Sequence, residues 1–395
     1  MNQSKTSIRC CPVCGNQRMK LLAMIDFLHL PESVLPNYYD IAACHLCGFV
    51  YNDTDATQAD FDRYYALQSK YDTTNINGVG GLSPFDRERY EKIINFLIPA
   101  LASPSASIID IGCAQGGLLK MLKEKGFQHL SGLDPSAACV KLVGSDGINV
   151  MEGNLLTFQP KQKFDVVILT GVLEHIFDLQ ATAAKLSSIL AGNGLLLVEV
   201  PDASRYLGYD SVPFYRFDFE HINHFSIPHL RNLFGRYEFE LADQKMTDNK
   251  VSEKLFSPTI LSLFRKSGQS FFCPDFTLKE VVSEYICQSE KLELNEPINQ
   301  LVDSQVSIYI WGLGAHTARL LKQTSLSRCN IKAFIDNDPH KAGHFLLGKP
   351  VLSSSILTGI SSDNPSLLVI CSVLYAAEMA EFARQNYAGK ILCLT

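Results

Sequence analysis

The chain has 395 residues, of which 46% are hydrophobic and 19% charged, and its net charge is −6. This is the composition of an ordinary globular protein with two or three domains. The acidic balance and the lack of a basic run argue against a nucleic-acid partner. No apolar stretch reaches the roughly 18 residues that a membrane span needs, and the polar N-terminus has no hydrophobic signal core. We therefore expect a cytoplasmic protein without a membrane partner, either a monomer or a homodimer.

The first 55 residues hold two cysteine pairs, each of the form CxxCG and about thirty residues apart. Two residues between thiolates allow both sulfurs to reach one tetrahedral zinc, and the following glycine fits a tight turn. The sequence predicts a structural zinc site, ligated by Cys11, Cys14, Cys44 and Cys47. The alternative is a small core of reduced cysteines. Cys10 and His45 lack the repeated spacing.

Residues 56–80 are rich in tyrosine and glycine and are expected to be a partly irregular connection. From residue 87 onward, amphipathic helical segments alternate with short apolar segments, which predicts an α/β fold with a doubly wound parallel sheet. The expected strands are residues 107–112, 129–134, 164–170 and 194–200, with 239–248 and 259–267 as the last two.

Residues 276–303 predict one charged helix, broken near Pro297, that leads to a second and smaller α/β domain. That domain restarts with the strand and glycine turn of SIYIWGLGAHTARLL, residues 307–321. The predicted segments are a zinc module, a larger α/β domain, a helical connector and a C-terminal α/β domain: residues 1–55, 56–268, 269–303 and 304–395.

A glycine-rich turn, DIGCAQGG, follows the first expected strand of the larger domain at residues 110–117. Glycines at this place allow a ligand to approach the backbone, and the N-terminus of the next helix favours negative charge. Asp134 ends the next strand, 22 residues after Gly112, where a carboxylate accepts from ribose hydroxyls. The turn, the acid and the strand order together predict a site for a nucleoside-containing cofactor.

The form DIGxxxG resembles motif I of the class I methyltransferases that use S-adenosylmethionine. GLDPS, GNLLTF and FDVVILTGVLEH agree with the later motifs of that family in order. The resemblance implies a cofactor site at Asp110, Gly112 and Gly116, with the two glycines against the methionyl part. It also implies that Asp134 holds the ribose and that Asn154 lies near the adenine.

The segment FEHINHFS, residues 219–226, follows the fifth strand and is therefore expected to be a loop at the carboxyl end of the sheet. Three interpretations stay open: a proton-transfer site, a polar structural loop, or a metal site that still needs a third ligand. Proton transfer is favoured, because an oxygen or an enolisable carbon acceptor needs a general base and histidine suits that role. A second pair, Glu174-His175, follows the fourth strand at the same end of the sheet.

The whole layout resembles the three-domain, zinc-containing C-methyltransferases that act on nucleotide-linked keto-sugars. The resemblance implies His221 as the base that removes a proton beside the keto group, with Glu220 and His175 nearby. It also implies a C-terminal domain that helps to hold the nucleotide. The predicted contacts to the substrate are Tyr65, His224, Gly312 and Gly314.

Other classes remain as alternatives to carbon methylation. The first is an O- or N-methyltransferase for another small metabolite or a polysaccharide precursor. The second is a nucleotide-dependent oxidoreductase that uses the turn at Gly312, although Asp336 opens DNDP and no catalytic lysine–tyrosine pair follows it. The third is a non-catalytic zinc scaffold, against which the glycine turn, Asp134 and the two Glu-His pairs count. For the C-terminal domain, a structural lid without a ligand is the alternative.

Overall fold

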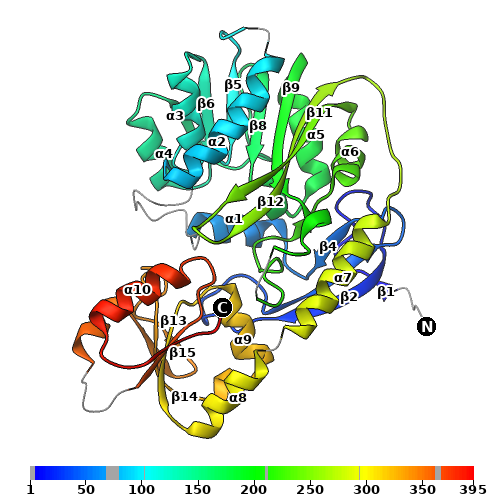
Figure 1. The fold of residues 1–395 in the computed structure, drawn as a ribbon. Helices are drawn as coiled ribbons and strands as arrows, with labels where there is room; N and C mark the ends of the chain where they lie inside the picture. Colours follow the sequence, from blue (N-terminus) through cyan, green and yellow to red (C-terminus); the bar gives the residue numbers. More distant parts are fainter. Residues whose placement is uncertain (1–4, 68–79, 102, 210–211, 293, 361–365) are drawn as a thin grey trace. The chain divides into compact units, whose positions relative to one another are not determined.

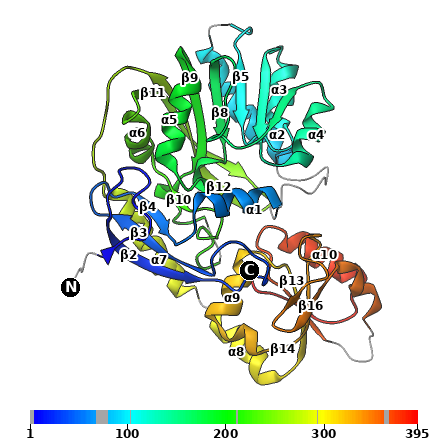
Figure 2. The same cartoon turned by 180° about the vertical axis from the view of Figure 1, so that it is seen from behind.

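The computed structural model, drawn in Figures 1 and 2, describes residues 5–67, 80–101, 103–209, 212–292, 294–360 and 366–395. The chain divides into two compact units. Unit 1 is Met1–Leu22, Ile41–Tyr209 and Glu220–Glu284, and unit 2 is Ala23–Asp40, Asp210–Phe219 and Tyr285–Thr395. The four segments expected from the sequence stay a prediction. Among the described residues, no helix combines the length and the apolar character that crossing a membrane requires.

Unit 1 is built on a seven-stranded sheet in the order β11-β12-β9-β8-β5-β6-β7. Its strands are β5 (Ile108–Ile111), β6 (Leu130–Asp134), β7 (Asn149–Glu152), β8 (Phe164–Thr170), β9 (Leu190–Pro201), β11 (Phe239–Lys250) and β12 (Phe256–Lys266). The strands from β9 to β7 run parallel. The mixed α/β fold with a parallel sheet, expected from the sequence, is therefore confirmed.

Helices cover both faces of this sheet, as Figures 1 and 2 show. Ile108 points to one face, where it packs in a cluster with α2 (Pro84–Leu97) and α3 (Gly117–Glu124). Ile109 points to the other face, where its cluster includes α5 (Leu179–Ile189) and α6 (Ile227–Gly235). A strand that is covered on both faces is mostly apolar, which explains the nearly continuous apolar runs in the sequence.

The last two strands of the sheet run antiparallel, which differs from the all-parallel sheet that the alternation predicted. β12 pairs antiparallel with β9, and β11 pairs antiparallel with β12 at the edge. Only five residues, 251–255, join β11 to β12. So short a connection can only form a hairpin, because parallel neighbours need a crossover of a dozen residues or more.

The N-terminal segment forms a second sheet, in the order β1-β2-β3-β4-β10. Its strands are β1 (Lys5–Thr6), β2 (Arg18–Asp26), β3 (Tyr38–Cys44), β4 (Val50–Asp53) and β10 (Asn223–His224). Asn223 pairs with Tyr51 and His224 with Val50. The segment FEHINHFS is thus fixed at its end by backbone pairing to β4. Part of the expected connection at 56–80 is a helix, α1 (Gln58–Leu67), and its residues 68–79 lie outside the described part of the chain.

Unit 2 contains a six-stranded sheet in the order β15-β16-β14-β13-β17-β18. Its elements are α8 (Asn295–Ser304), β13 (Ser307–Trp311), α9 (Ala315–Gln323), β14 (Asn330–Ile335), β15 (Phe345–Leu346), β16 (Lys349–Leu352), β17 (Leu367–Ile370), α10 (Ala376–Asn386) and β18 (Ile391–Cys393). The helix break expected near Pro297 lies earlier, between α7 (Thr277–Lys291) and α8. Pro297 sits in the first turn of α8, where its missing N–H leaves no hydrogen bond unmade.

Candidate active site

A cavity of about 630 Å³ lies at the carboxyl ends of β5, β6, β8 and β9, within unit 1. The glycine turn after β5 forms one of its walls. Gly112 has φ +73°, and a Cβ there would come within 2.7 Å of the Val172 side chain. Gly116 has φ +71° and faces Val143 at the same 2.7 Å. Both positions therefore require glycine. Gly112 lines the cavity, whereas Gly116, which was also predicted to bind the cofactor, packs against Val143 and is not among the lining residues.

Asp134 ends β6 at the same cavity and is held by backbone amides. Its Oδ2 accepts from the Ala114 N–H at 2.7 Å, and its Oδ1 accepts from the Ser136 N–H at 2.9 Å. Carboxylate oxygens accept more than one hydrogen bond each, so ligand hydroxyls are suitable donors to this acid. Asn154 also lines the cavity, and its Oδ1 accepts from the Thr157 N–H at 3.0 Å.

Asp110, on β5, lies at the base of the glycine turn and lines the cavity with only 2% of its surface exposed. Burial, and then the negative charge of Asp134, raise the pKa of Asp110 to about 8. Its Oδ1 has no hydrogen-bond partner among the described residues. A buried carboxylate oxygen without a partner is costly, so this position favours a ligand that brings a cation or a donor.

Two histidines and a tyrosine meet at the far side of this cavity. The rings of His175 and His221 are 4.7 Å apart between centroids, in an edge-to-face arrangement. The Tyr65 hydroxyl lies 2.8 Å from His175 Nδ1. All three side chains line the cavity, so the structure brings together His221, His175 and Tyr65 as the sequence suggested.

Two other residues that were predicted for this site do not line the cavity. Glu220 accepts a hydrogen bond from the Tyr64 hydroxyl at 2.9 Å, which directs that carboxylate to α1. His224 is fully buried, and its ring lies 3.2 Å from the Tyr206 hydroxyl and 3.1 Å from Asn52 Oδ1. Burial lowers the pKa of His224 to about 3, so this imidazole is neutral and supports the loop from within.

Sequence reasoning missed the carboxylate that does face the histidines, Glu174. It is 3% exposed and lines the cavity, and its Oε1 lies 4.0 Å from His175 Nε2. Ligand atoms of Glu174, His175 and His221 all lie within 4.8 Å of one another. The signal in the sequence was the pair Glu174-His175 itself, from which only the histidine was selected.

An ion pair that the sequence did not suggest, between half-buried Arg89 and buried Glu199, also lines the cavity. Arg89, from α2, donates through Nε to Glu199 on β9, at 2.9 Å from Oε2. Asn249, from β11, donates to the other carboxylate oxygen of Glu199 at 2.7 Å. The only signal was a charged residue inside the otherwise apolar run GLLLVEV.

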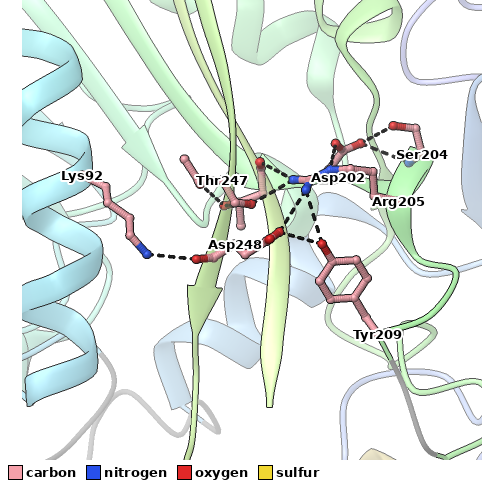
Figure 3. A network of polar contacts seen from close by, with 8 residues as sticks. Lys92, Asp202, Ser204, Arg205, Tyr209, Thr247 and Asp248 are labelled. Atoms are coloured by element: carbon pink, nitrogen blue, oxygen red, sulfur yellow. Dashed lines mark hydrogen bonds and ion pairs between the residues drawn. The ribbon is translucent and has the colours of Figure 1, made fainter. Parts of the chain in front are cut away.

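Polar contacts also fix the chain where it leaves β9 toward the histidine loop, as Figure 3 shows. Arg205 Nε donates to the buried Asp202 at 2.7 Å, and Arg205 Nη1 donates to Asp248 Oδ1 at 2.9 Å. The same guanidinium donates to the Thr247 carbonyl at 2.8 Å. The Tyr209 hydroxyl donates to Asp248 at 2.7 Å. This network ties the segment after β9 to the β11 strand.

The four cysteines of the N-terminal segment converge as the repeated spacing predicted. The Sγ atoms of Cys11 and Cys47 are 3.6 Å apart, and those of Cys14 and Cys44 are 3.5 Å apart. All four lie within 4.8 Å of one another. The glycine after each pair has a positive φ and donates its N–H to the first cysteine carbonyl of the pair, at 2.8 Å for Gly15 and 3.0 Å for Gly48. Four sulfurs around one point form a set that suits tetrahedral zinc.

Unit 2 repeats the turn-and-acid arrangement of unit 1. The Leu313 N–H, in the turn between Gly312 and Gly314, donates to Asp336 Oδ2 at 2.8 Å. The Asp338 N–H donates to Asp336 Oδ1 at 2.9 Å. Ala114 and Ser136 bind Asp134 in the same way in unit 1. Lys341 Nζ also lies 3.4 Å from Asp336 Oδ2, a contact that is particular to unit 2.

Residues 84–244 match a protein family described as Methyltransferase domain. The chain contains a methyltransferase domain. This match confirms the enzyme class expected from the glycine turn and from the strand order. The matched residues begin with α2 and end within β11, so they span the sheet, the cavity and the histidine loop.

Curated relatives of the methyltransferase domain act on different atoms. The chain is 29% identical over 101 residues to the probable (S)-tetrahydroprotoberberine N-methyltransferase 2 of Papaver bracteatum, covering 24% of this chain and 28% of that protein. It is 32% identical over 97 residues to the ubiquinone biosynthesis O-methyltransferase of Bradyrhizobium sp. strain ORS 278, covering 23% of this chain and 38% of that protein. The chain thus spans well under half the length of these relatives.

Among solved structures, one that the chain matches is the magnesium protoporphyrin IX methyltransferase from Synechocystis PCC 6803 with bound SAH. The similarity covers 53% of this chain and 100% of that chain, at 18% identity and a TM-score of 0.43.

Proposed function

We propose that this protein transfers a methyl group from S-adenosylmethionine to a carbon of a nucleotide-linked keto-sugar. The observation that carries the proposal is one cavity with two ends. Asp134 ends β6, on one side of β5 in the sheet, and His175 follows β8, on the other side, with the ring of His221 against it. Its volume of about 630 Å³ suits a cofactor together with an acceptor.

The residues at the cofactor end fit S-adenosylmethionine. When bound, this cofactor supplies a methyl group activated on a sulfonium sulfur. The Asp134 carboxylate would accept from the ribose hydroxyls, and Asp110 Oδ1 has no partner among the described residues, which suits the cofactor's ammonium group. Gly112 lines the cavity without a side chain, which would leave room for the methionyl part.

The residues at the other end would prepare the acceptor. His221 is the proposed base, which removes a proton from the carbon beside the keto group. The neighbouring ring of His175 and the Tyr65 hydroxyl would orient the sugar. The pairing of β10 with β4 holds the loop so that His221 faces the cavity.

Unit 2 would hold the nucleotide part of the substrate. Two backbone amides donate to Asp336 in the pattern found at Asp134, one from the glycine turn and one from two residues beyond the acid. This likeness supports a second nucleoside site at Gly312 and Gly314. A labelled nucleoside diphosphate should bind to the intact chain and should bind more weakly to Asp336→Asn. Equal affinity would leave unit 2 as a structural domain.

The four cysteines are proposed to hold one structural zinc. All four protein ligands are present, so no coordination position remains for a substrate. Purified protein should contain one zinc per chain, and Cys11→Ser should lower that content together with the stability of the fold. Protein that carries no metal after gentle purification would show that the cluster is only a core of reduced thiols.

An O- or N-methyltransferase is the second candidate, because the curated relatives carry these activities. Incubation with methyl-labelled S-adenosylmethionine and a panel of nucleotide keto-sugars separates the two. NMR of the product should show a new carbon–methyl bond. A methyl group on oxygen or nitrogen, or turnover only with other metabolites, would favour the second candidate.

A further inference from the structure

Glu174 lines the cavity and has a buried carboxylate oxygen that is unsatisfied among the described residues. Its Oε2 has no hydrogen-bond partner among the described residues, although only 3% of the residue is exposed. Its Oε1 faces His175 Nε2 at 4.0 Å. His175 Nδ1 lies 2.8 Å from the Tyr65 hydroxyl and 3.1 Å from the Glu220 carbonyl.

A proton on Oε2 gives this unpartnered oxygen a donor. An ionised carboxylate would keep a charge on a buried oxygen without a partner, whereas a carboxylic acid is neutral. Burial raises the pKa of Glu174 to about 7, and the charge of His221 opposes that rise. Glu199 raises the pKa further and Arg89 lowers it, so the acid is substantially protonated at neutral pH.

We propose that Glu174 acts as a neutral acid, whose Oε2–H donates a hydrogen bond to the acceptor's carbonyl oxygen and stabilises the enolate. This role rests on the proposed function, because only an enolisable carbon acceptor develops charge on that oxygen. A preformed donor in a dry site is among the largest contributions to such reactions.

The steps balance without another reactant. The base His221 takes the proton from the carbon, the C–H electron pair becomes the C=C bond, and the carbonyl π pair moves onto oxygen. Glu174 holds that oxygen by a hydrogen bond. The C=C pair then forms the new bond to the methyl carbon while the carbon–sulfur bond breaks, with its pair left on sulfur. The carbonyl re-forms, Glu174 keeps its proton, and His221 passes its proton to solvent.

The other carboxylates near the cavity are less suited to this role. Glu199 forms an ion pair with Arg89. Glu220 accepts a hydrogen bond from the Tyr64 hydroxyl and does not line the cavity. Asp110 stands on β5 at the base of the glycine turn, where the cofactor is expected.

The protonation of Glu174 can be measured without knowing the substrate. Infrared difference spectra between the wild-type protein and Glu174→Gln should contain a carboxylic-acid band near neutral pH, which disappears as the pH rises through about 7. Subtracting the variant removes the contribution of Asp110. Identical carboxylic-acid bands in the two proteins would overturn the proposal.

The catalytic role is tested by deuterium exchange at the carbon beside the keto group, with S-adenosylhomocysteine in place of the cofactor. Glu174→Ala should lower the exchange rate about 100- to 1,000-fold, the usual loss for one oxyanion donor. Glu174→Gln should lose less, because its amide N–H still donates. Cofactor affinity should change little in both variants, which also shows that they fold. The surface variant Glu88→Gln, from an exposed pair with Lys92, should exchange like the wild type.

A pH profile separates a donor from a structural residue. The kcat/KM of the wild type should fall on the alkaline side as Glu174 loses its proton, and that fall should be absent in Glu174→Gln. Unchanged exchange in both Glu174 variants would overturn this inference alone. No exchange by the wild type with any keto-sugar would overturn the proposed function instead. If turnover required added Mn²⁺ while the zinc content stayed unchanged, a bound cation and not the proton of Glu174 would stabilise the enolate oxygen. That result would also refute the proposal.

Discussion

Binding of the cofactor should release a proton from Asp110. The pKa of this buried carboxyl is raised to about 8, so it is mostly neutral at pH 7. An ammonium group placed at its unpartnered Oδ1 favours the ionised form. The apparent affinity should therefore rise with pH, because less free energy is needed to remove the proton before the ion pair forms.

The magnitude follows from the pKa of about 8. The ionised fraction is about 1% at pH 6 and about 9% at pH 7, so the Kd for S-adenosylmethionine should fall about ninefold across this unit. That ratio corresponds to about 1.3 kcal/mol. Near pH 7, about 0.9 proton should be released per cofactor bound. The range from pH 6 to 7 lies below the pKa of a typical α-amino group, so the ammonium group of the cofactor stays charged throughout.

Calorimetry in buffers of different ionisation enthalpy measures both the Kd and the number of protons released on binding. The matched control, Asp110→Asn, keeps the size of the side chain but cannot titrate, so its Kd should be nearly constant from pH 6 to 7. A wild-type Kd that is flat over this range, with no proton release, would refute the placement of the ammonium group at Asp110.

The raised pKa of Asp110 also makes the stability of the free protein depend on pH, but this stability falls with rising pH whereas the cofactor affinity rises. Its unfolded chain releases the Asp110 proton near pH 3.8, whereas the folded chain keeps it to about 8. Between these values the unfolded state binds fewer protons, so the free energy of unfolding falls as the pH rises, by up to about 1.4 kcal/mol per unit from this group.

Three further changes test the binding site and the frame around it. Asp134→Asn keeps one amide-bound oxygen but loses the charge, so calorimetry should show a loss of about 1.5–3 kcal/mol in cofactor binding; an unchanged Kd would exclude the ribose contact. Arg205→Ala leaves the buried Asp202 without its ion partner and should destabilise the fold by about 2–3 kcal/mol in urea titration. Glu253→Ala, from an exposed pair with Lys250, should change the stability by less than about 1 kcal/mol, and equal losses in both would contradict the importance of the network in Figure 3.

The apolar runs of the sequence were sufficient to predict most of the sheet. Ile108–Ile111 is buried on both faces, and such a strand is mostly apolar; its polar residue, Asp110, lines the cavity. The direction of β11 and β12 was not predictable from these runs, since periodicity does not record strand polarity. The five-residue connection between them was the only cue to a hairpin.

The residues of the candidate site were predictable where the backbone geometry allows only one residue type. Gly112 and Gly116 require glycine, and Asp134 ends a strand beside their turn, so spacing was sufficient. The choice between Glu174 and Glu220 was not predictable. Each precedes a histidine, and only the folded chain shows which carboxylate turns to the cavity and which to Tyr64.

The direction of the loop histidines depends on tertiary pairing as well. His224 lies on β10, where pairing with β4 buries its ring beside Asn52. His221 precedes that strand and lines the cavity. The segment 219–226 contains both histidines, but its sequence does not show the pairing with β4 that gives the two side chains different positions.

The most direct test of the proposed chemistry follows the substrate's proton at His221. Wild-type protein with a nucleotide keto-sugar and no methyl donor should exchange the proton beside the keto group with deuterated water. His221→Ala should lose roughly 100-fold or more in both exchange and turnover, the range for a positioned acid–base group, while its cofactor affinity stays nearly unchanged. Methyl transfer by the wild type without any such exchange, or near-normal turnover by His221→Ala, would contradict carbon methylation through an enolate at this site.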